Sequence, residues 1–533
     1  MTRFAVCVVL GASIGGAGGA WSQSPELVSV NRFGTNSGNH ISGSVTTGRS
    51  PGVSDDGRMV VFESRATDLV ALTDANGDLV DIFVRDMSSG QTELVSVRTS
   101  GDATAAGGSV DPVISGDGRW VAFVSGADDL VAEDTSGAGN VFVRDLVHGT
   151  TALVSIAHGG GAGGNGDSER PVISRGGRWV VFESDATNLV GLPDTNARTD
   201  LFAWSRDTGT VELVTVNAAG TGSGSGYPGS FAPTLSDPSG HVVRVAFAST
   251  FTDLVSGDGN GAGDVFVRTL PGGPTRSISG AANGESTSPF ISATGSWVAF
   301  TSHATDLGPL DTNGTYDCYL HDGAGMILVS RNLAGTDSGD DRSACAAVNA
   351  DRGFVVFESY ASDLVATDTN LEQDVFIREI RVGETSLVSP NAAATNSADG
   401  YSFIRDDLPG VSANGRFVVF ESFATDLEAV NDDGAVDVYV RDHCLGTTIL
   451  MDPNLSGTGS GNNESDHARM SRDGRWVVFS SRATNLDGTD ANDWIDTFRT
   501  EVPGWTDWHC GALDLFADGF ESGDTSAWSH AVP

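Results

Sequence analysis

Hydrophobic runs bounded by short polar turns recur along the whole chain, and one phrase returns eight times. Its first copy reads Gly-Arg-Met-Val-Val-Phe-Glu-Ser and runs from Gly57 to Ser64. A phenylalanine anchors every copy, and the eight anchors are Phe62, Phe123, Phe182, Phe247, Phe300, Phe357, Phe420 and Phe479. Their mean spacing is about 60 residues, a period found in repeat architectures. A unit of that length must contain several strands.

The second copy shows the strands of one unit. Two apolar runs, at residues 112–115 and 119–124, are joined by the turn signal Gly116-Asp117-Gly118. After a longer polar loop come a third run at 141–145 and a fourth at 152–155. Continuous runs of Val, Ile and Phe indicate strands covered on both faces, as in sheets stacked around an axis. We therefore predict an all-β fold, a single eight-bladed β-propeller of four-stranded blades.

The two ends of the repeat region complement each other. The eighth copy has three strand-like runs, the last at residues 496–500, but no Leu-Val-Ser phrase follows them. That phrase stands instead before the first copy, in Glu26-Leu27-Val28-Ser29-Val30. We predict that this N-terminal strand completes the eighth blade. Such a closure removes a sheet edge that would otherwise invite aggregation.

These units resemble a known repeat family. Segments such as Ser471-Arg472-Asp473-Gly474-Arg475-Trp476-Val477-Val478-Phe479, followed by Asp-Val-Phe-Val-Arg-Asp strands, resemble the TolB-type, WD40-like (PD40) propeller repeats of bacterial envelope and secreted proteins. The resemblance covers about residues 50 to 500 and implies the fold. The chain differs from TolB in that no α/β domain pattern precedes the repeats. A TolB-like role in a periplasmic complex is therefore not carried over.

Composition and the chain ends indicate export. The formal net charge is −40, and all thirty basic residues are arginine, without a basic cluster, which disfavours nucleic acid and anionic membranes as partners. Arg3 and the apolar segment after it predict a signal peptide over residues 1–22, and therefore a secreted, periplasmic or cell-surface protein. No other segment is apolar enough to span a membrane. We assign residues 23–501 to the propeller and 502–533 to a C-terminal tail, which resembles a terminal segment of varied secreted bacterial proteins.

Four cysteines remain after the predicted leader. An even number of cysteines in an exported chain permits disulfide bonds. Cys318 lies in the third strand of the fifth unit and Cys345 at the entry to the sixth, so these two neighbours could pair. Cys444 would then hold Cys510 in the tail. The alternative is four buried thiols, because spacing alone does not determine the pairing.

An Asp-x-Asn-x-x-x-Asp motif recurs in the loop between the second and third strands. Oxygen ligands at this spacing suit a hard cation such as Ca²⁺. Alternatively, Asp and Asn bond to their own backbone in turns, and the last Asp fixes the entry into the third strand. The predicted ligands, including the longer first-unit version, are Asp74, Asn76, Asp81, Asp194, Asn196, Asp200, Asp258, Asn260, Asp264, Asp311, Asn313, Asp317, Asp368, Asn370, Asp374, Asp490, Asn492 and Asp496.

The mouth of the central channel is the predicted ligand site. Strand alternation puts these Asp-Asn loops and the connections between blades on one face, which is therefore rich in loops and acidic. Residues just before the innermost strands should lie at the channel mouth and form either a binding site or a solvated rim. They are Asp111, Glu169, Arg170, Phe231, Asp406, Asp407 and His467. Four glutamates that follow an anchor are interpreted as ordinary strand-end carboxylates: Glu63, Glu183, Glu358 and Glu421.

No enzyme signature is present in the sequence. It contains no nucleophile elbow, no His-Glu-x-x-His motif and no phosphate-binding glycine loop. We expect an exported, non-enzymatic binding or scaffold module for a protein or glycan, with calcium as a structural ion. The alternative is a polysaccharide lyase or hydrolase with its site in the central channel, as in the pectin-fragment lyases that resemble this repeat class. Convergence of His467, Arg170 and nearby carboxylates would favour that alternative.

Overall fold

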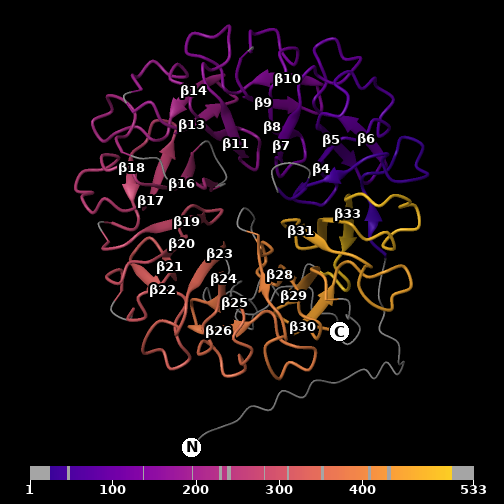
Figure 1. The fold of residues 1–533 in the computed structure, drawn as a ribbon. Coiled ribbons are helices and arrows are strands. Elements are labelled where there is room, and N and C mark those ends of the chain that lie inside the picture. Colours follow the sequence, from indigo (N-terminus) through magenta and orange to yellow (C-terminus); the bar gives the residue numbers. More distant parts are fainter. Residues whose placement is uncertain are drawn as a thin grey trace, which may run out of the picture.

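The computed structural model shows a ring of sheets around a central axis (Figure 1). It describes residues 24–44, 49–135, 137–194, 196–226, 231–236, 242–280, 282–308, 311–349, 353–405, 410–428 and 434–506. These residues form 33 strands and no helix, and every strand pair is antiparallel. Eight sheets follow one another around the ring, so the predicted eight-bladed β-propeller is confirmed.

The first four blades run through residue 277. Blade 1 contains β2 (Ser42–Gly43), β3 (Gly52–Val53), β4 (Met59–Ser64), β5 (Asp81–Asp86) and β6 (Gln91–Leu94). Blade 2 contains β7 (Ser109–Ile114), β8 (Trp120–Ser125), β9 (Asn140–Asp145) and β10 (Thr150–Leu153). Blade 3 contains β11 (Ser168–Ile173), β12 (Trp179–Ser184), β13 (Asp200–Ser205) and β14 (Thr210–Leu213). Blade 4 contains β15 (Thr234–Leu235), β16 (Val243–Ser249), β17 (Asp264–Leu270) and β18 (Thr275–Ser277).

The other four blades complete the ring. Blade 5 contains β19 (Ser286–Ile291), β20 (Val298–Ser302), β21 (Asp317–His321) and β22 (Met326–Leu328). Blade 6 contains β23 (Ser343–Asn349), β24 (Phe354–Ser359), β25 (Asp374–Glu379) and β26 (Glu384–Leu387). Blade 7 contains β27 (Ser402–Phe403), β28 (Phe417–Ser422), β29 (Asp437–Asp442) and β30 (Thr447–Leu450). Blade 8 contains β31 (Ser465–Met470), β32 (Trp476–Ser481), β33 (Asp496–Glu501) and, from the other end of the chain, β1 (Glu26–Leu27).

The anchoring phenylalanines form the core between blades. All eight are at most 1% exposed. Each stacks on an aromatic residue of the third strand in its own blade, as Phe62 does on Phe83 at 6.0 Å between ring centroids. Each core also takes residues from the next blade, because Val61 of blade 1 and Phe123 of blade 2 share one hydrophobic cluster. The recurring phrase therefore joins blades as well as building them.

The N-terminal strand closes the ring, as predicted. β1 pairs with β33 through Glu26 opposite Arg499 and Leu27 opposite Phe498, and Figure 1 shows an indigo strand beside yellow β33. The pairing continues where the Val28 N–H donates to the Thr497 carbonyl oxygen at 2.8 Å. Because Val28 is fully buried, this short strand contributes hydrophobic burial as well as hydrogen bonds.

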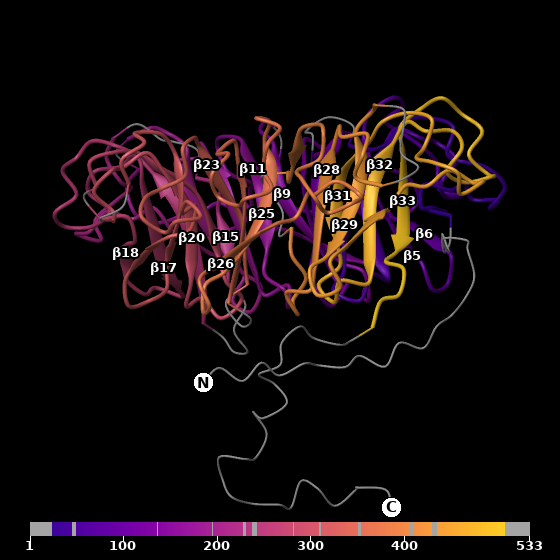
Figure 2. The same ribbon diagram turned by 90° about the horizontal axis from the view of Figure 1, so that it is seen from below.

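Strand alternation gives the ring two different faces (Figure 2). Long connections leave at one face, called here the loop-rich face, where the second strands end and the third strands begin. The turns after the first and third strands lie at the opposite face, called here the turn face. Figure 2 shows the strands running between these two faces.

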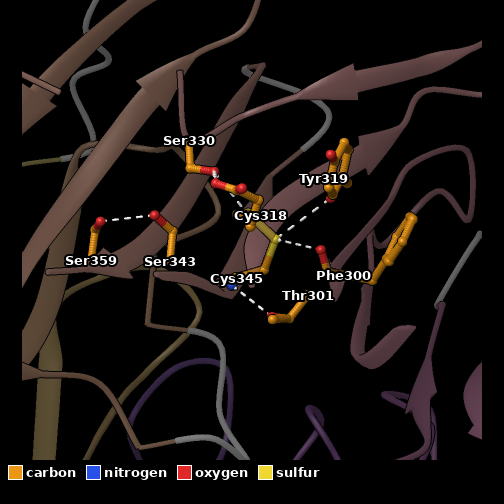
Figure 3. The surroundings of a disulfide bond; sticks show 9 residues. Phe300, Thr301, Cys318, Tyr319, Ser330, Ser343, Cys345 and Ser359 are labelled. Carbon is orange, nitrogen blue, oxygen red and sulfur yellow. Dashed lines mark hydrogen bonds between the residues drawn. A yellow bond between two sulfur atoms is a disulfide. The ribbon is translucent and has the colours of Figure 1, made fainter. Parts of the chain in front are cut away.

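A disulfide links blades 5 and 6 (Figure 3). Cys318 of β21 and Cys345 of β23 are bonded, with their Cα atoms 4.9 Å apart, so the predicted link between neighbouring blades is confirmed. Both residues are buried, and the Cys345 Sγ lies 3.1 Å from the Phe300 carbonyl oxygen. Cys444 is also disulfide-bonded. The partner proposed for it, Cys510, lies outside the described residues.

Other predictions fall partly or wholly outside the described residues. The predicted signal peptide at 1–22 lies outside them, as do residues 507–533 of the predicted tail. The first residues of that tail are described, and Trp505 donates its indole N–H to the Asp473 carbonyl oxygen at 3.0 Å. In the described part of the chain, no helix is long and apolar enough to cross a membrane.

Deleting residues 24–31 should markedly lower the melting temperature, because the last blade then loses its fourth strand and exposes an edge. Thermal unfolding followed by circular dichroism measures this. Arg32→Ala is the control, because Arg32 lies just beyond the closing segment and contacts the exposed ring of Phe33. A deletion variant that melts like the parent would contradict the closure.

Replacing Cys318 and Cys345 together by alanine should destabilise the folded state. Their sequence separation of 27 residues corresponds to roughly 3 kcal/mol of lost chain-entropy stabilisation. Denaturant unfolding of the double variant and of the oxidised parent tests this. Thiol titration of the unfolded, non-reduced parent should detect neither cysteine, and finding both as free thiols would exclude the bond.

Candidate functional site

The first Asp of the Asp-Asn loops in blades 1 and 3 forms a turn with its own backbone. Asp74 Oδ1 accepts the N–H groups of Asn76 at 3.1 Å and Gly77 at 2.9 Å. Asp194 Oδ1 accepts those of Asn196 and Ala197, both at 3.1 Å. These are the bonds expected from the turn interpretation of the motif.

In five of these loops the Asn is bonded at both ends of its amide. Its Nδ2 donates to a backbone carbonyl in the segment that connects the same blade to the next one. Asn313 Nδ2, for example, donates to the Gly339 carbonyl oxygen at 2.8 Å. Its Oδ1 accepts the N–H two residues on, as from Thr315 to Asn313 at 2.8 Å. The same pair of bonds is made by Asn196, Asn260, Asn370 and Asn492. The Oδ1 atoms of these five Asn residues therefore already accept hydrogen bonds, whereas Asn76 Oδ1 in the longer first-blade loop is buried without one.

The carboxylates leave more room for a cation than the amides do. Asp311 Oδ1 and Asp317 Oδ2 are buried without a hydrogen bond, and so are Asp368 Oδ1 and Asp374 Oδ2 in the next blade. Burial raises the pKa of Asp317 to about 7 and that of Asp374 to about 8. Among the described residues, no group of three or more His, Cys, Asp or Glu side chains forms a metal cluster. Calcium thus remains a prediction that depends on the two carboxylates of each loop.

A β-bulge shapes the innermost strands at the loop-rich end of the channel. The register with the second strand shifts between Val110 and Val113 and at the matching position of blades 3, 5 and 8. The residue inside each shift has a positive φ, namely 57° at Asp111, 52° at Arg170, 49° at Ser288 and 55° at His467. Bulges re-aim side chains, and positive φ is uncommon for residues other than glycine. A proline follows the first three of these residues. Proline inside a strand indicates a bulge, but the apolar runs around it predict regular strands.

Residues that follow the anchors hold these innermost strands in place. Glu63 Oε1 accepts the N–H of Asp111 in the next blade at 2.9 Å, and Glu421 Oε1 accepts that of Ala468 at 2.9 Å. Glu358 likewise accepts the N–H of Ile404. These three strand-end glutamates thus bond the backbone of the next blade, a contact that the strand-end interpretation did not specify. They lie far in sequence from their partners, and a local pattern does not show such contacts.

Two predicted mouth residues, Asp111 and Arg170, lie in one cluster on blades 1–3 together with Arg49 and Glu183. Arg49 Nε lies 3.8 Å from Asp111 Oδ1, and Arg170 Nη1 lies 3.7 Å from Glu183 Oε2. The Arg170 side chain is 53% exposed, whereas that of Glu183 is 6% exposed. Burial raises the pKa of Glu183 to about 7, although the nearby Arg170 opposes the shift. Glu169 is exposed beside this cluster.

A second cluster lies on blades 7 and 8, comprising Arg405, Glu421, Asp466 and His467. Arg405 contacts Glu421 at 3.1 Å and Asp466 at 3.3 Å, and His467 Nδ1 lies 2.8 Å from Asp466 Oδ1. Burial raises the pKa of Glu421, and Arg405 opposes that shift. No hydrogen bond or ion pair between described residues joins His467 to Arg170.

The remaining predicted mouth residues are placed differently. Phe231, predicted at the mouth, is instead fully buried and packs against Phe251 at 6.0 Å between ring centroids. That prediction is wrong because a large apolar side chain gains more from the core than from the channel. Asp406 and Asp407 lie outside the described residues.

A cavity of about 340 Å³ occupies the turn-face end of the channel. Apolar residues of the innermost strands line it, and Asp55, Arg175 and Arg472 are among its polar residues. Asp55 forms an ion pair with Arg175, and its backbone N–H donates to the Gly116 carbonyl oxygen at 2.9 Å. Tight turns of neighbouring blades thus meet around this cavity, which the sequence analysis did not predict.

The known proteins compared with this chain are only distantly similar to it. No protein-family model and no curated protein matches the chain. The Dos1 propeller is 10% identical over 90% of this chain and 94% of its own, with a TM-score of 0.42. A prolyl endopeptidase is 11% identical over 86% of this chain, with a TM-score of 0.41, and the match spans 55% of the endopeptidase. A putative TolB from Agrobacterium tumefaciens is 16% identical over 55% of this chain and 89% of its own, with a TM-score of 0.30. Membership of the TolB-type group therefore remains a prediction.

Stability should fall as the pH rises through the range in which the buried loop carboxyls ionise. Their folded pKa values, about 6 for Asp264, about 7 for Asp317 and about 8 for Asp374, lie above the unfolded value of 3.8. The folded state binds these protons more tightly, so their stabilisation is complete below pH 3.8 and is lost as the pH rises to about 8. In EDTA the melting temperature should be lower at pH 8 than at pH 5, and Asp317→Asn should reduce the difference.

Calcium should oppose this loss, because it binds the ionised carboxylates that the higher pH produces. At a hundredfold excess over Kd, each occupied loop adds about 2.7 kcal/mol, so calcium should raise the melting temperature most at pH 8. Asp317→Asn should remove one loop's contribution to the calcium-dependent rise in melting temperature. Asp102 is an exposed residue paired with Arg98, so Asp102→Asn should leave that rise unchanged. Identical melting curves in EDTA and in millimolar calcium at pH 8 would contradict calcium binding and support the interpretation of the loops as hydrogen-bonded turns.

Proposed function

We propose that the protein is an exported binding or scaffold module that takes a protein or glycan at the mouth of its central channel, on the loop-rich face. The observation that carries this proposal is the pair of charged clusters at that mouth. Each presents a partly exposed guanidinium over a buried carboxylate, Arg170 over Glu183 and Arg405 over Glu421. A guanidinium held in this way keeps donors for carbonyl, carboxylate or hydroxyl groups of a ligand.

The division of roles among residues supports a binding module. The residues that repeat hold the blades together, the anchors in all eight blades and the Asn amides in five. The mouth residues instead differ from blade to blade, with Asp111, Arg170, Ser288 and His467 at equivalent bulges. Binding sites combine such a rigid frame with varied polar groups. Calcium, where the loops bind it, would stabilise the frame.

Export is supported by two features. The predicted leader is one, and the buried Cys318–Cys345 disulfide is the other, because disulfides persist in oxidising compartments. The net charge of −40 favours a neutral or cationic ligand over nucleic acid. A partner at the cell surface fits both features.

The alternative of a lyase or hydrolase would need a catalytic constellation in the channel. In the described residues, His467 contacts Asp466 and Arg170 contacts Glu183, in two separate clusters. The two residues whose convergence would favour an enzyme, His467 and Arg170, therefore lie in different clusters, whereas each cluster can hold a ligand.

Removing a mouth guanidinium should weaken ligand binding. Calorimetry against a panel of soluble polysaccharides, oligosaccharides and peptides should find a ligand, and Arg170→Ala and Arg405→Ala should each raise its Kd about tenfold, because a hydrogen bond to a charged group is lost. Two arginines away from the mouth give matched controls. The exposed fraction of the Arg58 side chain, 54%, matches the 53% of Arg170. The Arg98 and Arg405 side chains are both 34% exposed.

Both controls should bind as the parent does. Equal weakening in Arg58→Ala would mean that charge alone, and not the mouth, governs binding. If chromatography detects shorter products released from a bound polysaccharide, the proposal of a non-enzymatic binding module is wrong and the enzyme alternative holds.

A further inference from the structure

Matched pairs of residues lie on the loop-rich face at the ends of the inner two strands, and we call them rim pairs. In each, the residue after the second strand donates its N–H to the carbonyl of the residue before the first strand, as Phe423 does to Tyr401 at 3.0 Å. The described pairs are Ile41 and Arg65, Gly108 and Gly126, Asp167 and Asp185, Glu285 and His303, Arg342 and Tyr360, Tyr401 and Phe423, and Glu464 and Arg482. Because one backbone geometry recurs, the pairs differ only in the chemistry of their side chains.

Aromatic rings occupy the rim pairs of three consecutive blades. His303, Tyr360, Tyr401 and Phe423 are the rings in the described pairs, and they belong to blades 5, 6 and 7. Blades 2 and 3 carry only glycine and aspartate at these positions. The loop-rich face of the propeller therefore carries aromatic side chains at the rim pairs of blades 5–7. At the rim pairs of blades 2 and 3 it carries only glycine and aspartate.

Three of these side chains and Phe403 of β27 form one group, which we call the aromatic platform: Tyr360, Tyr401, Phe403 and Phe423. Tyr401 is at its centre, with ring centroids 6.2 Å from Tyr360, 5.3 Å from Phe403 and 6.5 Å from Phe423. Phe423 is 46% exposed, and the other three are half-buried. Burial and the nearby Tyr360 and Glu358 raise the pKa of Tyr401 to about 12, so its hydroxyl stays protonated.

Charged groups border the platform on two sides. The Arg342 guanidinium lies 4.5 Å from the centroid of Tyr360, and that of Arg405 lies 5.4 Å from the centroid of Phe403. Arg405 belongs to the blade 7–8 cluster, through Glu421 at 3.1 Å and Asp466 at 3.3 Å. The platform is therefore continuous with the channel mouth.

The platform is not needed to close the ring. Blades 2 and 3 form the same backbone bond between rim-pair residues with no aromatic ring, from Gly126 to Gly108 at 3.2 Å and from Asp185 to Asp167 at 2.9 Å. Aromatic rings left partly in water at four neighbouring positions lose hydrophobic stabilisation that full burial would give. Exposed apolar groups gathered in this way mark an interaction site.

We propose that the aromatic platform is a subsite for a neutral glycan. A pyranose ring has an apolar C–H face, which fits an aromatic ring, and hydroxyls at its edge, which fit the donors and acceptors of Arg342, Arg405 and Asp466. The backbone at Tyr360 and Phe423 is already paired within the rim, so an extended peptide finds no row of free main-chain groups there. The net charge of −40 opposes a polyanionic ligand. This subsite rests on the proposed function and assigns its ligand class.

The experiment measures binding of cello-, xylo-, chito- and malto-oligosaccharides to the full chain by calorimetry. At least one series should bind, and Phe423→Ala and Tyr360→Ala should each weaken it tenfold or more, the loss expected when an aromatic anchor of a site is truncated. Phe423→Tyr keeps the ring and should bind as the parent does. Phe33→Ala is the matched control, because Phe33 is 67% exposed and also lies under an arginine, Arg32, at 4.7 Å.

Circular dichroism melting of each variant separates lost binding from lost folding. If no oligosaccharide binds, or if Phe423→Ala binds as tightly as the parent, the glycan subsite is wrong. Peptide binding that depends on Phe423 would also overturn it while leaving the binding module intact. Loss of binding in Arg170→Ala with no effect of Phe423→Ala would place the ligand at the channel mouth alone, which supports the proposed function and overturns this subsite.

Discussion

One buried hydrogen bond, described in seven of the eight blades, is the constraint on which the repeat depends. It joins the residue that begins the third strand to the residue that follows the Leu-Val phrase after the fourth, as Ser96 Oγ donates to Asp81 at 2.8 Å. The same hydroxyl accepts the N–H of Ile82 at 3.1 Å, so it is satisfied on both sides. A buried polar group costs stability unless it is bonded in this way. The bond therefore fixes the outer strand, the Asp-Asn loop and the exit to the next blade together.

The unusual blades show how strict this constraint is. In blade 2 an amide replaces the acid, and Ser155 Oγ donates to Asn140 Oδ1 at 2.8 Å. In blade 7 Asp452 occupies the position of the hydroxyl residue, opposite Asp437 at the start of the third strand. Both side chains are fully buried. Burial raises the pKa of Asp452 to about 6, and the Asp437 side chain opposes that shift. In blade 8 the hydroxyl comes from Ser29 at the other end of the chain, bonded to Asp496 at 2.6 Å, which ties ring closure to the same interaction.

Much of the fold could be predicted from sequence because each of its determinants is local and repeated. The anchor phrase gives the strand count, and Leu27-Val28-Ser29 matches the missing phrase of the last blade. The site could be predicted only in part. The contact from Glu63 to Asp111 crosses 48 residues and joins two blades, so no repeat within one unit shows it. The bulge at Asp111 and Arg170 is a backbone feature, for which the following proline is the only local sign.

Function in such a ring depends on broken symmetry. Eight equivalent rim positions with the same side chain would offer a ligand eight equal sites, whereas a ligand that spans several blades is recognised through their differences. The pairing of β1 with β33 fixes the order of blades, so the aromatic platform always lies beside the blade 7–8 cluster. The residues that repeat thus make the frame rigid, and the residues that do not repeat, placed by that frame at equivalent backbone positions, determine which ligand fits.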